Sequence, residues 1–341
     1  MNPQKVYFKY LGIRLVRRIL ENPIFSQNPY FRDFVRKLSL RKAKRLQKRT
    51  FDGSFAPWAV EIELTNGCNI ECVFCPNPEH VRPKGMMSLE TFQRIASEIK
   101  KLNVPHIIIS GFGEPTLDKN LVSKLEHFKT IGISSEVMLV SNGTIFNPEI
   151  LKEICDRELV DIISISVDAG DEESYVEIHK KEGYAKIRAS VEYIAELKLK
   201  KGSSKPKVDL RYKDFYMNKG QIHKFIETFS SHSDKMSIYA NICTWPGADS
   251  KIKAVDKETL IKIVCPSLYQ GMRINWNGDV VICPQDYEAH AICGNILKES
   301  MLEIWNGEVL SKYRKMHENY QFNEIPVCKD CDINTHLLVP L

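Results

Sequence analysis

Long apolar runs are missing from this chain of 341 residues. No stretch reaches the roughly 18 uncharged apolar residues that a membrane-spanning helix needs, so we expect no transmembrane segment. The first residues also lack the pattern of a secretory signal peptide. The ten cysteines cluster at spacings typical of metal ligands, so disulfide bonds are not expected. These absences favour a reducing cytoplasm, because oxygen would destroy such metal sites.

Two kinds of recognition site are also missing from the sequence. His106, His179 and His290 show no zinc-type pairing, and we treat them as ordinary polar residues. No aromatic-and-basic recognition module follows the basic N-terminus, so we expect no nucleic-acid partner.

Positive charge is concentrated in residues 1–50. This segment carries fourteen Lys and Arg but only Glu21 and Asp33 as acids, which makes it +12. Because the whole chain carries +5, the remainder carries −7. The asymmetry indicates a separate role for the N-terminal segment.

The same segment is predicted to be helical. Phe31, Phe34, Val35 and Leu38 recur at the spacing of one helix face. One interpretation is a helical extension packed on the body of the protein. The alternatives are docking to an anionic membrane surface and, with least support, nucleic-acid binding.

The most informative motif is a loop with three cysteines, Cys68, Cys72 and Cys75, directly after an apolar run at 58–64. Three thiolates on one tight loop can hold three irons of a four-iron cluster. The fourth iron would then stay open for chemistry, whereas clusters that only carry electrons close it with a fourth cysteine. The C-x3-C-x2-C spacing differs from ferredoxin runs and from the paired cysteines of zinc ribbons.

Strand-like and helix-like segments alternate from residue 58 to about residue 240, which implies βαβ units and a parallel sheet in an α/β fold. Strands are predicted over 58–64, 106–110, 136–141, 161–167, 208–212 and 235–239. Helices are predicted over 89–101, 119–130, 149–156, 184–200 and 220–229. The loops at the carboxyl ends of such strands are expected to carry the site.

Three further motifs end apolar runs in that region: residues 111–115 (GFGEP), 141–143 (SNG) and 164–168 (SISVD). Together with the cysteine loop they resemble the motifs of the radical S-adenosylmethionine (SAM) enzymes, in the same order. Phe74 fills the aromatic position before the third cysteine, and Phe112 replaces the second glycine of the family's GGEP motif. The resemblance implies a partial (β/α)₆ barrel whose catalytic [4Fe–4S] cluster is held by Cys68, Cys72 and Cys75.

The resemblance also implies which residues contact SAM. Glu114 would accept hydrogen bonds from the methionine ammonium, and Gly113 would let the backbone approach it. The ribose and carboxylate would meet Ser141, Asn142, Ser166 and Asp168. Taken alone, each of these polar residues could equally be a turn or helix-cap residue. They are predicted to contact SAM because they share a position after successive strands.

A second set of cysteines lies near the C-terminus: Cys265, Cys283, Cys328 and Cys331. Asn277-Gly278, between two short strand-like runs, predicts a β-hairpin within it. The set resembles the twitch domain, the short form of the SPASM extension of radical SAM enzymes, and implies one auxiliary [4Fe–4S] cluster. A structural zinc is the alternative.

Three cysteines remain outside these sets. Cys293 could replace one auxiliary ligand, and Cys155 is expected in the core. Cys243 is either an inert loop thiol or a hydrogen-atom donor to a substrate radical. We therefore expect a basic helical extension at 1–50, a radical SAM barrel at 56–240 and a twitch domain at 241–341.

The implied reaction is reductive cleavage of SAM to a 5′-deoxyadenosyl radical that abstracts hydrogen from a substrate. Twitch-bearing dehydrogenases of aminoglycoside biosynthesis are the nearest analogy, which favours oxidation of a carbohydrate, cyclitol or lipid-linked saccharide. A peptide-modifying enzyme that makes crosslinks or epimers is the alternative, although no leader-binding winged helix is seen. A non-catalytic electron carrier would not need the SAM motifs. A flavodoxin or ferredoxin would supply the electrons.

Overall fold

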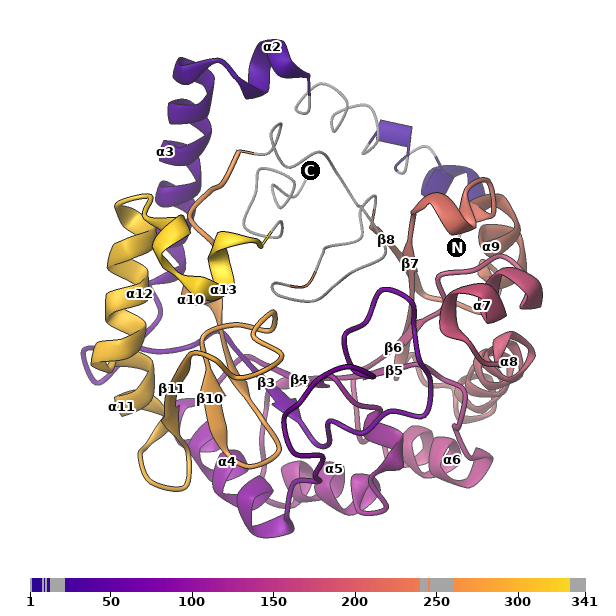
Figure 1. Cartoon of the computed structure of the whole chain (residues 1–341). Coiled ribbons are helices and arrows are strands. Elements are labelled where there is room, and N and C mark those ends of the chain that lie inside the picture. Colours follow the sequence, from indigo (N-terminus) through magenta and orange to yellow (C-terminus); the bar gives the residue numbers. More distant parts are fainter. Residues whose placement is uncertain are drawn as a thin grey trace.

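The computed structural model describes residues 2–7, 9, 11–12, 22–239, 245 and 261–331. Its centre is a nine-stranded sheet in the order β11-β10-β9-β3-β4-β5-β6-β7-β8. From β9 through β3 to β8 all neighbouring strands are parallel. Figure 1 shows this sheet curved, with the helices that follow its strands on the outside.

The six predicted strands are all present. Their bounds are β3 (Ala59–Glu63), β4 (His106–Ser110), β5 (Glu136–Ser141), β6 (Ile162–Ser166), β7 (Lys207–Lys213) and β8 (Lys235–Tyr239). Ile107 and Ile109 of β4 are fully buried, as expected for a strand covered on both faces. The six parallel strands of the predicted partial barrel are therefore confirmed, and a helix follows each of the first five within the described residues.

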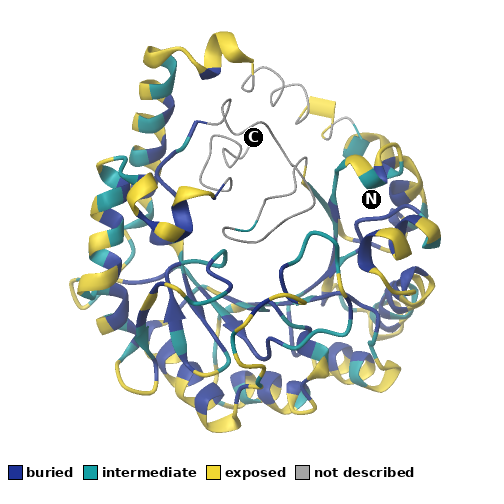
Figure 2. Cartoon of the chain, viewed as in Figure 1, coloured by how far each residue is buried: buried dark blue, intermediate teal, exposed yellow. Residues whose placement is uncertain are grey.

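The covering helices are α4 (Leu89–Leu102), α5 (Leu121–Thr130), α6 (Pro148–Asp156), α7 (Glu172–His179), α8 (Tyr184–Lys201) and α9 (Ile222–Phe229). Ser88 caps α4 by accepting from the N–H of Thr91, and Pro148 opens α6. Figure 2 shows their buried faces turned toward the sheet and their exposed faces outward. Only α7 was not predicted from the sequence.

The C-terminal segment joins the same sheet. Its strands are β9 (Gly271–Ile274), β10 (Asp279–Val281) and β11 (Ile292–Asn295). The predicted hairpin is confirmed at Gly278, whose φ of +87° suits glycine. Strand β9 pairs in parallel with β3, so β3 has strands on both sides. The boundary expected near residue 241 falls largely outside the described residues and stays a prediction.

Short elements complete the described part. Around the C-terminal strands lie α10 (Ser267–Gln270), α11 (Met301–Asn306), α12 (Glu308–Glu318), η4 (Phe322–Glu324) and α13 (Pro326–Lys329). Elsewhere lie the small hairpin β1 (Thr50–Phe51) and β2 (Ser54–Phe55) and the single turns η1 (Pro115–Leu117) and η2 (Tyr216–Asn218). Within the described residues, no helix combines the length and apolar character needed to cross a bilayer.

The N-terminal segment contains α2 (Pro23–Ser26) and α3 (Pro29–Leu46). The predicted apolar face of α3 is wrong in part, because Phe34 and Leu38 are 61% and 48% exposed. The helix instead packs through Val35 against Ile261 and Ile263. Close packing is possible because the next buried positions on this face are Ser39 and Ala43, whose side chains are small.

Candidate functional site

The three-cysteine loop follows β3 directly, and its thiols lie close enough to influence one another. Burial raises the pKa of Cys75 to about 11 and, together with the charges of the other two thiols, raises the pKa of Cys72 well above its usual value. Burial also raises the pKa of Cys68. Thiols in such surroundings become thiolates only when a metal centre compensates the charge, which fits an iron–sulfur ligand set.

Phe74 anchors this loop. Its ring meets the rings of His179 and Phe215 edge-on, at 6.0 and 5.9 Å, and Nζ of Lys213 lies 4.5 Å from its centroid. The indole N–H of Trp245 donates to the Phe74 carbonyl at 2.7 Å. The aromatic position before Cys75 therefore packs inward and fixes the loop.

Glu114 is the polar centre of the site. It is 2% exposed and accepts from the N–H and hydroxyl of Thr116, from the hydroxyl of Ser141 (2.8 Å) and from the N–H of Asn142 (2.7 Å). Burial raises the pKa of its carboxyl, and these donors oppose that rise. The GFGEP and SNG motifs, separate in sequence, are thus joined through one carboxylate.

Asn142 connects this carboxylate to the cysteine loop. Its side-chain nitrogen lies 3.9 Å from Sγ of Cys68 and donates to Oδ1 of Asn69 at 2.9 Å. The structure therefore brings Cys68, Glu114, Ser141 and Asn142 together, as the sequence predicted. Their contact with SAM stays a prediction.

Gly113 lies where no side chain fits. A Cβ atom there would stand 2.2 Å from the carbonyl oxygen of Thr65 and 2.4 Å from that of Gly67. The next residue, Glu114, donates its N–H to Gly67 at 2.8 Å. Glycine therefore lets the GFGEP loop lie directly against the start of the cysteine loop.

The polar residues after β6 are arranged differently. Asp168 has a φ of +57° and is fully buried, and its carboxylate accepts from the backbone N–H (2.7 Å) and Nζ (3.1 Å) of Lys213. Both carboxylate oxygens are thus engaged within the protein, and Asp168 positions Lys213, whose Nζ lies over the ring of Phe74. Ser166 ends β6 at the same edge.

His179 was missed as a functional residue. It is fully buried at the end of α7, in contact with Cys72 and 4.0 Å from the Asp168 carboxylate. A sequence signal existed, because Asp171 and Ser174 form a capping box that marks the start of α7. The expectation that His179 is an ordinary polar residue is therefore corrected.

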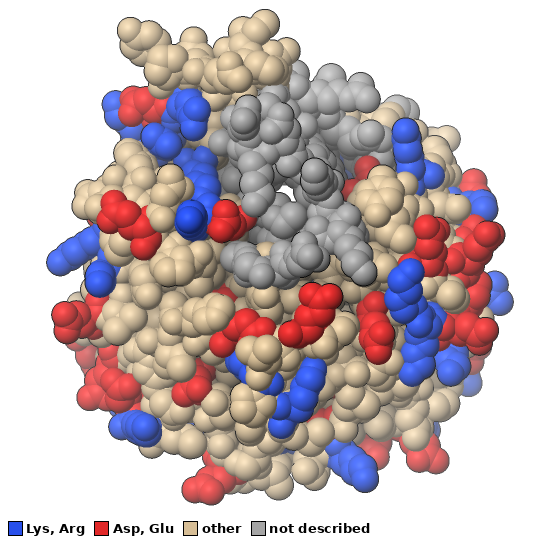
Figure 3. Space-filling model, in the orientation of Figure 1, with Lys and Arg blue, Asp and Glu red and all other residues tan. Residues whose placement is uncertain are grey.

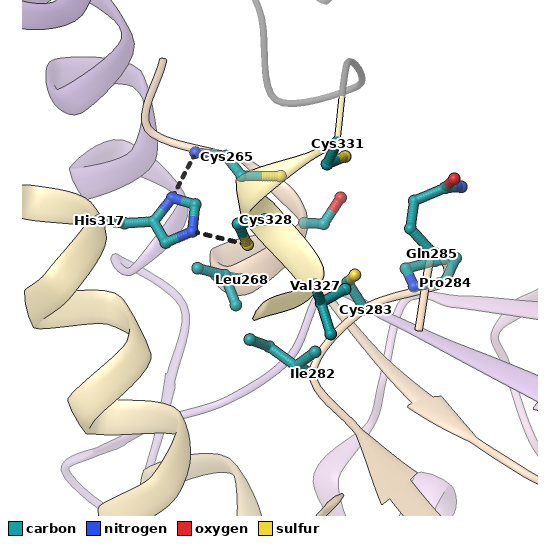
Figure 4. Close-up of a pocket in the computed structure, with 11 residues that line it drawn as sticks. Cys265, Leu268, Ile282, Cys283, Pro284, Gln285, His317, Val327, Cys328 and Cys331 are labelled. Atoms are coloured by element: carbon teal, nitrogen blue, oxygen red, sulfur yellow. Dashed lines mark hydrogen bonds between the residues drawn. The ribbon is translucent and has the colours of Figure 1, made fainter. Parts of the chain in front are cut away.

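The second cysteine set surrounds a cavity of about 100 Å³ (Figure 4). Cys265, Cys283, Cys328 and Cys331 all line it, together with His317 and apolar side chains such as Leu268. In the described part of the chain, no three His, Cys, Asp or Glu side chains converge on one point as around a single metal ion. The four thiols instead share one cavity.

The donor chemistry of this cavity fits an iron–sulfur cluster. Burial raises the pKa of Cys283 well above its usual value, and the charges of the other three thiols raise it further. Burial likewise raises the pKa of Cys265 and Cys328. Thiols whose ionisation is disfavoured in this way need a cationic centre to become ligands.

The remaining cysteines lie elsewhere. Cys155 is buried in the core, as predicted. Cys293 does not line the cavity and directs its thiol to the Ala291 carbonyl at 3.7 Å, so the expectation that it could replace a ligand is not supported. Cys243 lies outside the described residues.

Direct contacts join the two cysteine loops. Arg82, beyond the first loop, donates through Nε to the carbonyl of Tyr287, which follows Cys283 (2.6 Å). The rings of Phe112, Trp245 and Tyr287 pack together, with centroids 5.0 to 6.3 Å apart. The two sites therefore belong to one continuous piece of structure.

Comparison with known proteins assigns the two cysteine sets to two different family models. The radical SAM superfamily model matches residues 62–206, and the iron–sulfur cluster-binding SPASM model matches residues 265–332. GTP 3′,8-cyclase of Desulforamulus reducens is 27% identical over 143 residues, which are 41% of this chain and 43% of that protein. The chain thus spans less than half the length of this curated relative.

Two solved structures show the same fold. BtrN in complex with AdoMet and 2-DOIA aligns with a TM-score of 0.59 and 17% identity, covering 82% of this chain and 94% of BtrN. Streptococcus suis SuiB bound to precursor peptide SuiA aligns with a TM-score of 0.65 and 14% identity, covering 88% of this chain and 75% of the SuiB chain. The SPASM match favours an auxiliary iron–sulfur cluster over the alternative of a structural zinc. This cluster is additional to the SAM-binding [4Fe–4S] cluster. The chain is a radical SAM enzyme with a C-terminal SPASM iron–sulfur cluster domain.

Proposed function

We propose that this enzyme oxidises a carbohydrate, cyclitol or lipid-linked saccharide. The observation that carries the proposal is the closed set of four cysteines, attached to the SAM-type site through the β3–β9 pairing. An electron left on a substrate radical would have an acceptor that is joined to the SAM-type site by the same sheet. One cavity with four thiols supports the short, one-cluster form of the domain.

The roles of individual residues follow from their contacts. When bound, a reduced [4Fe–4S] cluster supplies the electron that splits SAM into methionine and a 5′-deoxyadenosyl radical. Cys68, Cys72 and Cys75 would hold that cluster. The saturated carboxylate of Glu114 fixes Asn142 beside Cys68, where both would orient the methionine end of SAM. A flavodoxin or ferredoxin is the proposed electron donor.

Unpartnered polar atoms on the strands support a polar substrate. Among the described residues, Oγ of Ser164 on β6 and Nε of Arg211 on β7 are buried without a hydrogen-bond partner. Buried polar groups normally find a partner, and a hydroxylated molecule offers donors and acceptors for both. This favours a saccharide or cyclitol over a hydrocarbon.

A peptide-modifying enzyme that forms crosslinks or epimers is the second candidate. The structural likeness to SuiB bound to its precursor peptide favours it, although at 14% identity that likeness concerns the fold. A non-catalytic electron carrier does not account for the arrangement of Glu114, Ser141 and Asn142. Substrate screening with saccharides and with peptides, counting 5′-deoxyadenosine against product, separates the first two.

The Cys328→Ala variant tests the electron-acceptor role. We expect it to keep SAM cleavage but to lose oxidised product, because the electron would have no acceptor. The Cys155→Ala variant, which changes a core thiol, is the control. Unchanged product formation by Cys328→Ala would show that the second cluster is not the acceptor.

The surface of the N-terminal segment supports the proposal that this enzyme is cytoplasmic and docks on anionic membranes. Tyr30, Phe34 and Leu38 follow one another along the solvent face of α3 and are 85%, 61% and 48% exposed. Toward the end of α3 the exposed residues are basic: Arg41, Lys42, Lys44 and Arg45. Figure 3 shows basic side chains gathered over α3, below the uncharged α2. Apolar insertion with cationic contact suits an anionic bilayer.

Co-sedimentation with vesicles of phosphatidylglycerol and phosphatidylcholine tests this docking. We expect binding at low salt that weakens in Phe34→Ser/Leu38→Ser. Leu199→Ser is the matched control, because Leu199 is an exposed leucine on α8. If the wild-type protein does not bind these vesicles at low salt, the membrane contact is wrong.

A further inference from the structure

Both ring nitrogens of His317 contact cysteines of the four-thiol cavity. The backbone N–H of Cys265 donates to Nδ1 at 3.3 Å, and Nε2 lies 3.3 Å from Sγ of Cys328 (Figure 4). The imidazole, on α12, is fully buried and meets the ring of Phe322 edge-on at 5.0 Å. It is therefore held in one orientation between two cysteines.

The backbone contact fixes which nitrogen carries the hydrogen. An N–H group donates only to a nitrogen with a free lone pair, so Nδ1 of His317 carries no hydrogen. Nε2 must then carry it, since a neutral imidazole has one N–H. The contact with Cys328 is thus an N–H···S hydrogen bond.

We propose that His317 is a positioning residue that raises the reduction potential of the auxiliary cluster through this N–H···S bond to Cys328. The inference rests on the proposed role of Cys328 as a ligand of that cluster. Reduction adds negative charge to the cluster, part of which resides on the ligand sulfurs. A donor to one of them stabilises the reduced state more than the oxidised state, which favours acceptance of an electron.

The surroundings strengthen the same effect. Nζ of Lys262 donates to the carbonyl of Cys328 at 2.8 Å and also contacts the carbonyl of Lys329. This ammonium pins the short helix α13 that carries Cys328 and adds a positive charge near its sulfur. The cavity wall at Cys328 therefore favours negative charge.

The test isolates the auxiliary cluster in the full chain. A Cys68→Ala/Cys72→Ala/Cys75→Ala background removes the first cluster, and redox titration followed by electron paramagnetic resonance gives the potential of the second. His317→Phe, which has no donor, should lower the reduction equilibrium constant about tenfold, because hydrogen bonds to charged groups are strong. For a one-electron couple this is 59 mV. His317→Gln, whose amide nitrogen reaches the position of Nε2, should restore most of the potential.

His290→Gln, at an exposed histidine of the same region, is the matched control and should leave the potential unchanged. An unaltered potential in His317→Phe, with about four irons retained, overturns the proposal. If His317→Phe does not hold its cluster, pulsed electron paramagnetic resonance of the ¹⁵N-histidine-labelled background protein decides. A weak ¹⁵N coupling to the reduced cluster supports the bond, and no coupling refutes it. Full iron content in Cys328→Ala would instead refute the ligand assignment.

Discussion

Nδ1 of His179 lies 3.0 Å from Sγ of Cys72, the middle cysteine of the three-cysteine loop. Nε2 of the same ring lies 3.1 Å from the carbonyl oxygen of Val167. Because a carbonyl only accepts hydrogen bonds, Nε2 carries the hydrogen and Nδ1 is left to accept from the thiol. The last residue of α7 thus holds Cys72 in position.

Replacing Cys72 with Ala should abolish SAM cleavage, because two thiolates cannot hold the open cluster. Iron content should fall by about four per chain. The measurement is 5′-deoxyadenosine formation with dithionite as reductant, together with iron and sulfide analysis. Cys155→Ala should keep both quantities, and retained 5′-deoxyadenosine formation by Cys72→Ala would overturn the site assignment.

Replacing Glu114 with Gln should weaken SAM binding and destabilise the protein. The new amide NH₂ would face groups that already donate, such as the N–H of Asn142. An unsatisfied buried donor costs about 1–3 kcal/mol. Equilibrium dialysis with SAM and urea unfolding measure the two effects. Glu126→Gln removes an exposed carboxylate and should change the free energy of unfolding by less than about 1 kcal/mol.

Gly113→Ala should displace the GFGEP loop, because the new methyl group cannot coexist with the carbonyls of Thr65 and Gly67. We expect lower thermal stability and weaker SAM binding together. Gly67→Ala is the matched control, since its Cβ would meet only Oγ1 of Thr65 at 3.5 Å. Equal stability of the two variants in thermal unfolding would contradict the close approach.

Replacing Arg273 with Met should destabilise the junction between β9 and β3. Nη2 of Arg273 lies 3.1 Å from the carboxylate of Glu63, both are buried, and Glu63 also pairs with Arg82. Removing one partner of a buried ion pair typically costs 3–5 kcal/mol, and because Arg82 still pairs with Glu63 we expect about 3 kcal/mol or less. Arg157→Met, which breaks exposed pairs with Glu153 and Glu126, should cost about 1 kcal/mol or less in urea unfolding.

Stability should depend on pH through Asp171, which caps α7. Hydrogen bonds from Lys224 and Ser174 lower its pKa to about 2 in the folded protein. A lowered carboxyl pKa adds stability above the unfolded value near 4, and this is lost as the pH falls toward 2. Asp171→Asn still caps the helix but does not titrate, so its unfolding free energy should fall less steeply over this range. If the unfolding free energies of the wild-type protein and Asp171→Asn fell equally steeply with pH, the lowered pKa of Asp171 would be contradicted.

Much of the barrel was predictable because parallel strands buried on both faces give short apolar runs. The bounds of β4, β5 and β8 match the sequence prediction residue for residue. Positions at the carboxyl ends of neighbouring strands must also meet, so Glu114 and Ser141 could be brought together without a structure. Helix α7 was missed because it has only eight residues and a weak apolar pattern.

What could not be predicted depends on contacts between distant segments. Nothing in residues 271–274 indicates that this strand pairs with β3. The partners of His179 and His317 are likewise set by packing, so His179 looked like an ordinary polar residue and nothing in the sequence pointed to His317. On α3, the choice between burying Val35 or Phe34 was decided by which residues lie opposite, Ile261 and Ile263.

The pairing of β9 with β3 also constrains how the protein is made. Strand β3 is the first of the large sheet to leave the ribosome, yet the strand that covers its outer edge is separated from it by most of the chain. Until β9 emerges, β3 presents unpaired backbone groups that invite aggregation. The part of the sheet that carries the three-cysteine loop is therefore completed late in synthesis. Iron should accordingly be loaded after translation rather than during it.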